Sequence, residues 1–251
     1  MADLVIGAPA RRREWIIEPY LEHVMEACGQ AHVEPEFVFV VPKDDPTIDL
    51  IRSRMSEPFA GGAKVDFILT DEEPAPHDKR TWGPVRLRLM VDLRNRLLRR
   101  VRQLAPLAFL SLDTDILIAP GAIQAALEGL QCYRGTDVSG KPWQYDAVGM
   151  RTYMSILGNQ FPSQGQLVNN HLMNRTDWIK GTHPADVIMA AKLMGPAAYK
   201  VDYEFHTEGE DVGWSVACAR FGVKLGYCAD AKAKHVMRPI DLTALDERVG
   251  F

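Results

Sequence analysis

Two aspartates one residue apart lie between two mostly apolar stretches, residues 107–112 and residues 116–118. An apolar segment of this kind is typical of a buried strand, and acids at its end would face a cleft. Because alternate residues of an extended chain point to the same side, Asp113 and Asp115 could hold one divalent cation or its bound water. Such a cation would bind a diphosphate. A turn with two solvated aspartates is the alternative, since short motifs of this kind also arise by chance.

A second pair of acids, Glu210 and Asp211, follows Gly209 at the predicted start of a helix that ends at Phe221. Acids in the first turn of a helix are stabilised by its dipole and its exposed amide groups, so both could be caps. His235 follows the last predicted strand, and a single histidine usually has a structural role. The residue types alone therefore leave two interpretations for each of these positions.

Alternating strands and helices carry these acids. Apolar runs predict the strands, and apolar residues at helical spacing predict the helices between them. The predicted strands are residues 4–7, 37–41, 65–69, 107–112, 187–194 and 223–228. The predicted helices are residues 16–28, 45–55, 84–103, 120–130 and 210–221. This alternation predicts an α/β fold with a mainly parallel sheet that helices cover on both faces.

The first strand-to-helix turn contains neither GxGxxG nor GxxxxGK[ST], which excludes two common nucleotide-binding loops. The third predicted strand ends near Asp71 in a polar loop with Pro74, Pro76 and His77. Loops of this kind bind ligands or serve as solvated connectors, and both interpretations stay open for this one.

The helix at residues 84–103 is rich in arginine. Its members are Arg86, Arg88, Arg94, Arg96, Arg99, Arg100 and Arg102. For most of them we expect a solvated helix face whose aliphatic arms cover the core. One or two near the strand ends could contact phosphates, because a forked guanidinium suits a diphosphate.

Composition limits the class of protein. The 251 residues suit one domain and are 47% hydrophobic and 25% charged, as in ordinary globular proteins. The net charge of −4 argues against a protein that coats nucleic acid nonspecifically. The four cysteines lack the spacing of metal ligands, and we expect reduced core residues. We find no signal peptide or membrane-spanning run and expect a soluble, cytoplasmic protein.

Two segments combine these features into longer motifs. The first is Leu93-Arg94-Asn95-Arg96-Leu97-Leu98 leading into Leu110-Ser111-Leu112-Asp113-Thr114-Asp115. The second, residues 185–236, contains Gly209-Glu210-Asp211-Val212, Ala219-Arg220-Phe221-Gly222 and Asp230-Ala231 before His235. Together they resemble the nucleotide-sugar half and the catalytic half of inverting GT-A glycosyltransferases, especially glycosyltransferase family 2.

The resemblance implies a GT-A (Rossmann-like) fold, in which helices flank a mainly parallel central sheet and a small antiparallel element lies on the acceptor side. It implies a single domain over residues 1–251. The nucleotide-sugar-binding half would cover about residues 1–120, and the acceptor-binding and catalytic half about residues 121–251. Residues 131–183 are less regular, and we expect acceptor-binding loops there. Their aromatic residues could stack on a ligand or belong to the core, and they are Trp143, Tyr145, Tyr153, Phe161 and Trp178.

The resemblance also implies roles for individual residues. The implied donor-binding residues are Pro9 and Asp71 at the nucleotide base, Arg94 at the diphosphate or nucleotide, and Asp113, Thr114 and Asp115. The implied ligands of Mn²⁺ or Mg²⁺ are Asp113, Asp115 and His235. The implied catalytic pair is Asp211, as general base, with Glu210 beside it.

The implied function is the metal-dependent transfer of a sugar, with inversion, from a nucleotide sugar to an acceptor hydroxyl. UDP-sugars are favoured as donors, because members of that family commonly use them. The acceptor stays open among a hydroxymethylated DNA base, a protein, a glycan or lipid-linked sugar and a small metabolite. We find no membrane or processivity motif near the C-terminus, which argues against a polysaccharide synthase.

Three other classes share some of these features. A nucleotidyltransferase would share the sheet and the paired acids, but the expected glycine-rich basic loop after the first strand is missing. A phosphatase with an aspartyl nucleophile would need Thr or Val where Leu117 stands. A non-catalytic module that binds sugar or nucleic acid would not need the aspartate pair.

Overall fold

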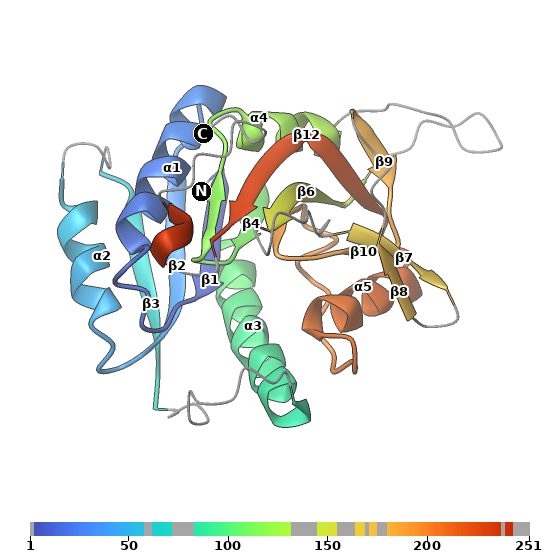
Figure 1. Ribbon diagram of the computed structural model, residues 1–251, viewed down its shortest axis with the longest axis horizontal. Helices are drawn as coiled ribbons and strands as arrows, with labels where there is room; N and C mark the ends of the chain where they lie inside the picture. The colour runs from blue at the N-terminus through green and yellow to red at the C-terminus, as the bar shows by residue number, and fades with distance from the viewer. Residues whose placement is uncertain are drawn as a thin grey trace.

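A computed structural model of the chain describes residues 3–57, 62–71, 83–131, 145–154, 164–168, 171–174, 180–236 and 239–242 (Figure 1). One half of its central sheet is parallel and has the strand order β3-β2-β1-β4. The bounds are β1 (Leu4–Pro9), β2 (Pro35–Pro42), β3 (Lys64–Thr70) and β4 (Ala108–Leu112). Since parallel strands share one direction, their carboxyl ends lie at the same edge of the sheet. The segments after β1, β3 and β4 therefore reach that edge together.

The order continues β4-β11-β6-β12-β5, and this second half is mixed. The bounds are β5 (Ile116–Ile118), β6 (Ala147–Met154), β9 (Thr182–Pro184), β11 (Ala191–Met194) and β12 (Leu225–His235). Strand β11 runs antiparallel to both β4 and β6, so Lys192 lies opposite Ser111. Strand β12 runs parallel to β6 and antiparallel to β5 and β9. The sheet is therefore mostly parallel, as the sequence predicted.

A separate antiparallel sheet has the order β10-β7-β8. Its strands are β7 (Gln164–Val168), β8 (His171–Asn174) and β10 (Val187–Ile188). Figure 1 shows it beside α5 (Glu210–Arg220), and contacts between α5 and β10 join the two. This sheet matches the small antiparallel element that we expected, and its role toward an acceptor stays a prediction.

Helices cover both faces of the central sheet. The remaining helices are α1 (Ile17–Ala31), α2 (Thr47–Met55), α3 (Pro84–Leu104), α4 (Ala122–Gln131) and the short 3₁₀ helix η2 (Pro239–Leu242). Alternation along β1 shows the division: Leu4 and Ile6 pack with α1, α2 and α4, whereas Val5 packs with α3 and α5. The result is three layers, helix, sheet and helix. In the described part of the chain, no helix is long and apolar enough to cross a membrane.

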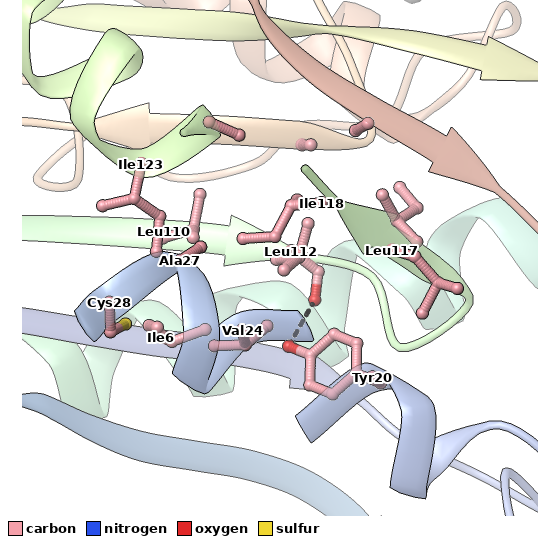
Figure 2. Close-up of a cluster of buried hydrophobic side chains, with 14 of the residues drawn as sticks. Ile6, Tyr20, Val24, Ala27, Cys28, Leu110, Leu112, Leu117, Ile118 and Ile123 are labelled. Atoms are coloured by element: carbon pink, nitrogen blue, oxygen red, sulfur yellow. Dashed lines mark hydrogen bonds between the residues drawn. The ribbon is translucent and has the colours of Figure 1, made fainter. Parts of the chain in front are cut away.

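The larger core positions the end of β4. Figure 2 shows the cluster in which Leu110 and Leu112 pack with α1 and α4. Within it, the buried Tyr20 hydroxyl donates a hydrogen bond to the carbonyl oxygen of Leu112, at 3.2 Å. Because Leu112 directly precedes Asp113, this bond ties the start of the acidic turn to helix α1.

Two predicted elements differ from the structure. The prediction of one continuous strand over residues 187–194 is wrong. The strand is interrupted between β10 and β11, where Ala190 has a φ of 52°. The last strand extends past residue 228 to His235, because residues 232–235 pair with β6 and 233–235 also pair with β5.

Some expected features lie outside the described residues, namely Pro74, Pro76, His77, Cys132, Trp143, Phe161 and Trp178. The two aromatic residues of the middle region that are described, Tyr145 and Tyr153, are both buried. The described cysteines, Cys28, Cys218 and Cys228, are buried and form no disulfide, as expected.

A substitution at Gly213 would test how closely α5 packs against the segment that precedes it. A β-carbon built at Gly213 would lie 1.9 Å from the carbonyl oxygen of Glu204. We expect Gly213→Ala to lower the free energy of unfolding by about 3 kcal/mol, because backbone must move to make room. Urea denaturation monitored by circular dichroism measures this change.

Gly29 provides the control, since a β-carbon there meets no atom within 4 Å and the residue lies on the exposed side of α1. Gly29→Ala should stabilise the protein by about 0.5 kcal/mol through helix propensity. Similar effects of the two substitutions would contradict the close packing of α5.

Candidate active site

The turn between β4 and β5 presents Asp113 and Asp115 to two different arginines. The amide of Ile116 donates to the carbonyl of Asp113 at 2.9 Å and closes the turn. The carboxylate of Asp113 accepts hydrogen bonds from Arg94 Nη2, at 2.8 and 3.1 Å. The carboxylate of Asp115 accepts one from Arg13 Nη2, at 2.8 Å. The two aspartates therefore have separate cationic partners.

Arg94 links this turn to helix α5. Its side chain comes from α3 and is almost completely buried, with 1% of the residue exposed. Besides Asp113, it donates to Glu210 through Nε at 3.3 Å and to the hydroxyl of Ser111 through Nη1 at 3.4 Å. One guanidinium thus joins an acid of the β4–β5 turn to an acid in the first turn of α5.

This placement changes how we interpret Arg94. We expected it to contact a diphosphate or nucleotide, but its guanidinium nitrogens donate to protein groups in a buried position. The geometry gives no support to a direct contact with a ligand. A role in connecting Asp113 and Glu210 fits the structure better.

Lys192 forms an ion pair with the Asp211 carboxylate. It lies on β11, is fully buried and contacts Asp211 at Oδ1. The backbone amide of Ala190 donates to the other carboxylate oxygen, Oδ2, at 3.0 Å. The Lys192 ammonium also lies over the rings of Tyr203 and Trp214, 5.3 and 5.2 Å from their centres. These contacts fix both the position and the orientation of the Asp211 carboxylate.

The pKa values of the two neighbouring acids of α5 are shifted in opposite directions. Burial opposes ionisation of Asp211, but the charges of Lys192 and Arg94 outweigh it and lower its pKa. Burial and then the charge of Asp211 raise the pKa of Glu210, against the effect of Arg94. Burial also raises the pKa of Asp113, although Arg94 opposes this. Asp211 is therefore the acid of this group that most strongly favours its ionised form.

His235 joins Asp115 on the other side of the turn. The pairing of β12 with β5 places His235 opposite Ile116, and His235 Nε2 lies 3.3 Å from Asp115 Oδ1. Burial disfavours the charged imidazole, but the hydrogen bond and the charge of Asp115 outweigh it and raise the pKa of His235. Against burial, His235 and Arg13 lower the pKa of Asp115. The strand pairing explains how a histidine far along the chain reaches the first acidic pair.

The expected metal ligands are only partly gathered. Asp115 and His235 face each other, whereas Asp113 is turned to Arg94. Among the described residues, no group of three or more His, Cys, Asp or Glu side chains is placed to hold a metal ion. Of the expected ligands, the structure thus brings Asp115 and His235 next to each other.

The remaining predicted donor residues lie around this edge of the sheet. Pro9 ends β1 opposite Val40 of β2 and is half-buried. Asp71 follows β3, has a side chain that is 82% exposed, and pairs with Lys43. Thr114 lies between the two aspartates but is 1% exposed, and its hydroxyl has no hydrogen-bond partner in the described part of the chain. Their roles toward a ligand stay predictions.

The sequence-based prediction missed two residues of the site, Arg13 and Lys192. Lys192 is a lone lysine within the apolar stretch of residues 187–194, and that isolation is a signal for a buried ion pair. Arg13 ends a run of three arginines after the first strand. The run was visible, but the sequence does not show which of its members turns toward Asp115.

The ion pair between Lys192 and Asp211 leads to a prediction about stability. Lys192→Met leaves a buried carboxylate without its cation, so we expect a loss of about 3–5 kcal/mol in the free energy of unfolding. Urea denaturation measures it. Because the pKa of Asp211 is lowered on folding, the contribution of the pair should vanish as the pH falls through that lowered pKa, below the ordinary value of 3.8.

Asp211→Asn provides the other arm of a double-mutant cycle. If the two groups interact directly, the double variant should lose less stability than the sum of the single variants. Additive losses would contradict a direct interaction between the two side chains.

No family model and no curated protein sequence matches this chain. Solved structures do match it. The S. aureus TarS fragment 1–349 aligns with a TM-score of 0.58 and 14% identity over 96% of this chain and 62% of that fragment. The same fragment in complex with UDP gives a TM-score of 0.56, also at 14% identity, with the same coverage of each chain.

The chain thus spans less than two thirds of the TarS fragment and 38% of the longer TarS structure, which it matches with a TM-score of 0.58. TarS is a glycosyltransferase of the GT-A type. At this level of identity the similarity concerns the fold. The chain has the mixed α/β fold of GT-A glycosyltransferases, as the sequence predicted.

Proposed function

We propose that this protein transfers a sugar from a nucleotide sugar to an acceptor hydroxyl, with inversion at the anomeric carbon. One observation supports the proposal above all others. Arg94 joins the acidic turn after β4 to the acids that begin α5, in a chain with the fold of GT-A glycosyltransferases. A UDP-sugar is the favoured donor, because the similar TarS fragment forms a complex with UDP.

The donor would bind along the carboxyl ends of the parallel strands. Pro9 and Asp71, after β1 and β3, would contact the nucleotide base, and the turn with Asp113, Thr114 and Asp115 would lie next to the diphosphate. In open α/β sheets, ligands commonly bind at this edge.

Asp115 and His235 would hold Mn²⁺ or Mg²⁺. Their facing oxygen and nitrogen atoms, 3.3 Å apart, are suitable donors for such a cation, whereas Asp113 in the same turn is bonded to Arg94. A single carboxylate and an imidazole fit this role, because a divalent cation in nucleotide sites takes few protein ligands and completes its coordination with phosphate oxygens and water. When bound, the cation would stabilise the negative charge of the departing diphosphate.

Asp211 would act as the general base. An acceptor hydroxyl has a pKa far above neutral, so a carboxylate must remove its proton as it attacks the sugar. Lys192 and the amide of Ala190 hold Asp211 ionised and in one orientation, while Glu210 connects it to Arg94 and the donor side. Attack assisted from the face opposite the diphosphate is a single displacement, which inverts the anomeric carbon.

Asp211→Asn tests the base. We expect transfer, or hydrolysis of the donor in the absence of an acceptor, to fall about 10²- to 10⁴-fold, because the amide cannot accept the proton. Binding of UDP should stay at the wild-type level. Radiolabelled sugar release and isothermal titration calorimetry measure the two effects.

Asp49→Asn makes the same chemical change at an exposed position of α2 and should leave both measurements unchanged. Loss of UDP binding in the Asp211 variant, with or without loss of turnover, would count against the role of base.

Chelation tests the metal. With EDTA present, we expect donor hydrolysis to stop and Mn²⁺ to restore it, because Asp115 and His235 would no longer hold the cation. His235→Asn should raise the Mn²⁺ concentration that gives half-maximal activity. Full activity after exhaustive chelation would rule out the metal requirement.

Two other outcomes would identify one of the alternative functions instead. Pyrophosphate release from a nucleoside triphosphate and a sugar phosphate would identify a nucleotidyltransferase. Binding of nucleotide sugars without any turnover would identify a non-catalytic module.

A further inference from the structure

Arg13 enters the site from the segment between β1 and α1, and the proposed mechanism leaves it without a function. Its Nη2 lies 2.8 Å from Asp115 Oδ2, and its side chain is 33% exposed. Asp115 therefore has a partly exposed guanidinium on one side and the His235 imidazole on the other.

The backbone of this segment is held in place from α2. The amide of Arg12 donates to Asp45 Oδ2 at 2.8 Å, and the amide of Arg13 donates to the hydroxyl of Thr47 at 3.0 Å. Asp45 Oδ1 in turn accepts the amide of Thr47 at 3.0 Å. Both acceptor residues are buried, with 8% and 0% of their surfaces exposed. The position of Arg13 is thus built into the fold.

The backbone conformation of Arg12 is a second indication that the fold fixes the position of Arg13. Its φ of 49° lies in the left-handed region, which non-glycine residues rarely adopt. Backbone in such a region persists only where surrounding bonds hold it, and it is frequent at ligand sites. Here those bonds come from Asp45 and Thr47, and their effect is to direct Arg13 toward the tip of β4.

The two arginines of the site differ in what they can still bind. Arg94 is buried and donates to Asp113, Glu210 and Ser111 through its three guanidinium nitrogens. For Arg13, the guanidinium contact within the described residues is the one through Nη2 to Asp115. A guanidinium carries five N–H donors in a rigid fork that matches phosphate oxygens. Arg13 therefore combines a fixed position, partial exposure and unused donors.

Stability alone gives a weak reason for this arrangement. A partly exposed ion pair contributes little to folding, because water screens the charges. A permanent cation next to Asp115 has a clear use if an anion binds there. It stabilises negative charge at the moment that charge develops, without any rearrangement of solvent.

We propose that Arg13 is a ligand of the donor's diphosphate group, oriented in advance by Asp115. The inference rests on the proposed function and deepens it: the site would have a protein cation for the diphosphate in addition to a bound metal ion. In the absence of donor, Asp115 holds the guanidinium at the end of β4. On binding, the remaining N–H donors of Arg13 bond to phosphate oxygens.

The test compares ligands that differ only in their phosphates. Wild-type protein and Arg13→Gln are titrated calorimetrically with UDP, inorganic pyrophosphate and uridine, each in EDTA and in Mn²⁺. Loss of a charged hydrogen-bonding group predicts about 10- to 100-fold weaker binding of UDP and pyrophosphate, and the loss should be clearest in EDTA. Uridine should bind both proteins equally. Arg13→Lys should recover part of the affinity, because lysine keeps the charge but lacks the fork.

Arg52→Gln is the matched control, since Arg52 is an exposed arginine of α2 that pairs with Asp49. It should bind every ligand as the wild type does. Circular dichroism and thermal unfolding of each variant check that the fold is intact.

Three outcomes would overturn the inference. The first is unchanged binding of UDP and pyrophosphate by Arg13→Gln. The second is an equal loss of uridine binding, which would indicate a distorted site. In both cases, turnover of nucleotide sugars by the wild type would leave the proposed function standing. The third is a wild-type protein that binds neither UDP nor pyrophosphate, which would overturn the function as well.

Discussion

The candidate site depends on the burial of positive charge between acids. Asp113 is distant in the sequence from the adjacent pair Glu210 and Asp211, yet the three acids lie close enough to influence one another's pKa. Buried carboxylates without cations would take up protons, because a low-dielectric interior disfavours charge. Arg94 and Lys192 oppose this: they lower the pKa of Asp211 against burial, whereas the pKa values of Asp113 and Glu210 stay raised. Without these two cations, burial and mutual repulsion would raise the pKa of all three acids.

The fold explains why these cations are available where they are needed. Helix α3 packs across the sheet face that α5 also covers, so Arg94 reaches both β4 and α5. Strand β11 reverses direction beside β4, and Lys192 enters the same layer opposite Ser111. The Tyr203 ring faces both cations and the Trp214 ring faces Lys192, and these aromatic faces further favour positive charge there. Packing and electrostatics thus meet at a single layer of side chains.

The charges divide the site into two sides with different chemistry. Around Asp115, Arg13 and His235 offer cationic groups that are partly exposed. Around Asp211, Lys192 and the amide of Ala190 favour the ionised carboxylate and fix its orientation. Arg94 lies between them. The proposed glycosyl transfer would use both kinds of environment.

Local sequence patterns were sufficient for the fold class, the helices α1 to α5, the strands β1 to β4 and the positions of the two acidic pairs, but they did not predict β6, β7, β8 or β9. Apolar periodicity determines which face of an element is buried, and that property is encoded within each short segment. The partners of the acids required the tertiary structure. The family resemblance implied that His235 lies near Asp115, but nothing in the sequence indicates that Arg13 will contact Asp115 or that the strand is interrupted at Ala190. Charge pairing is a long-range property, because it depends on which elements the fold brings side by side.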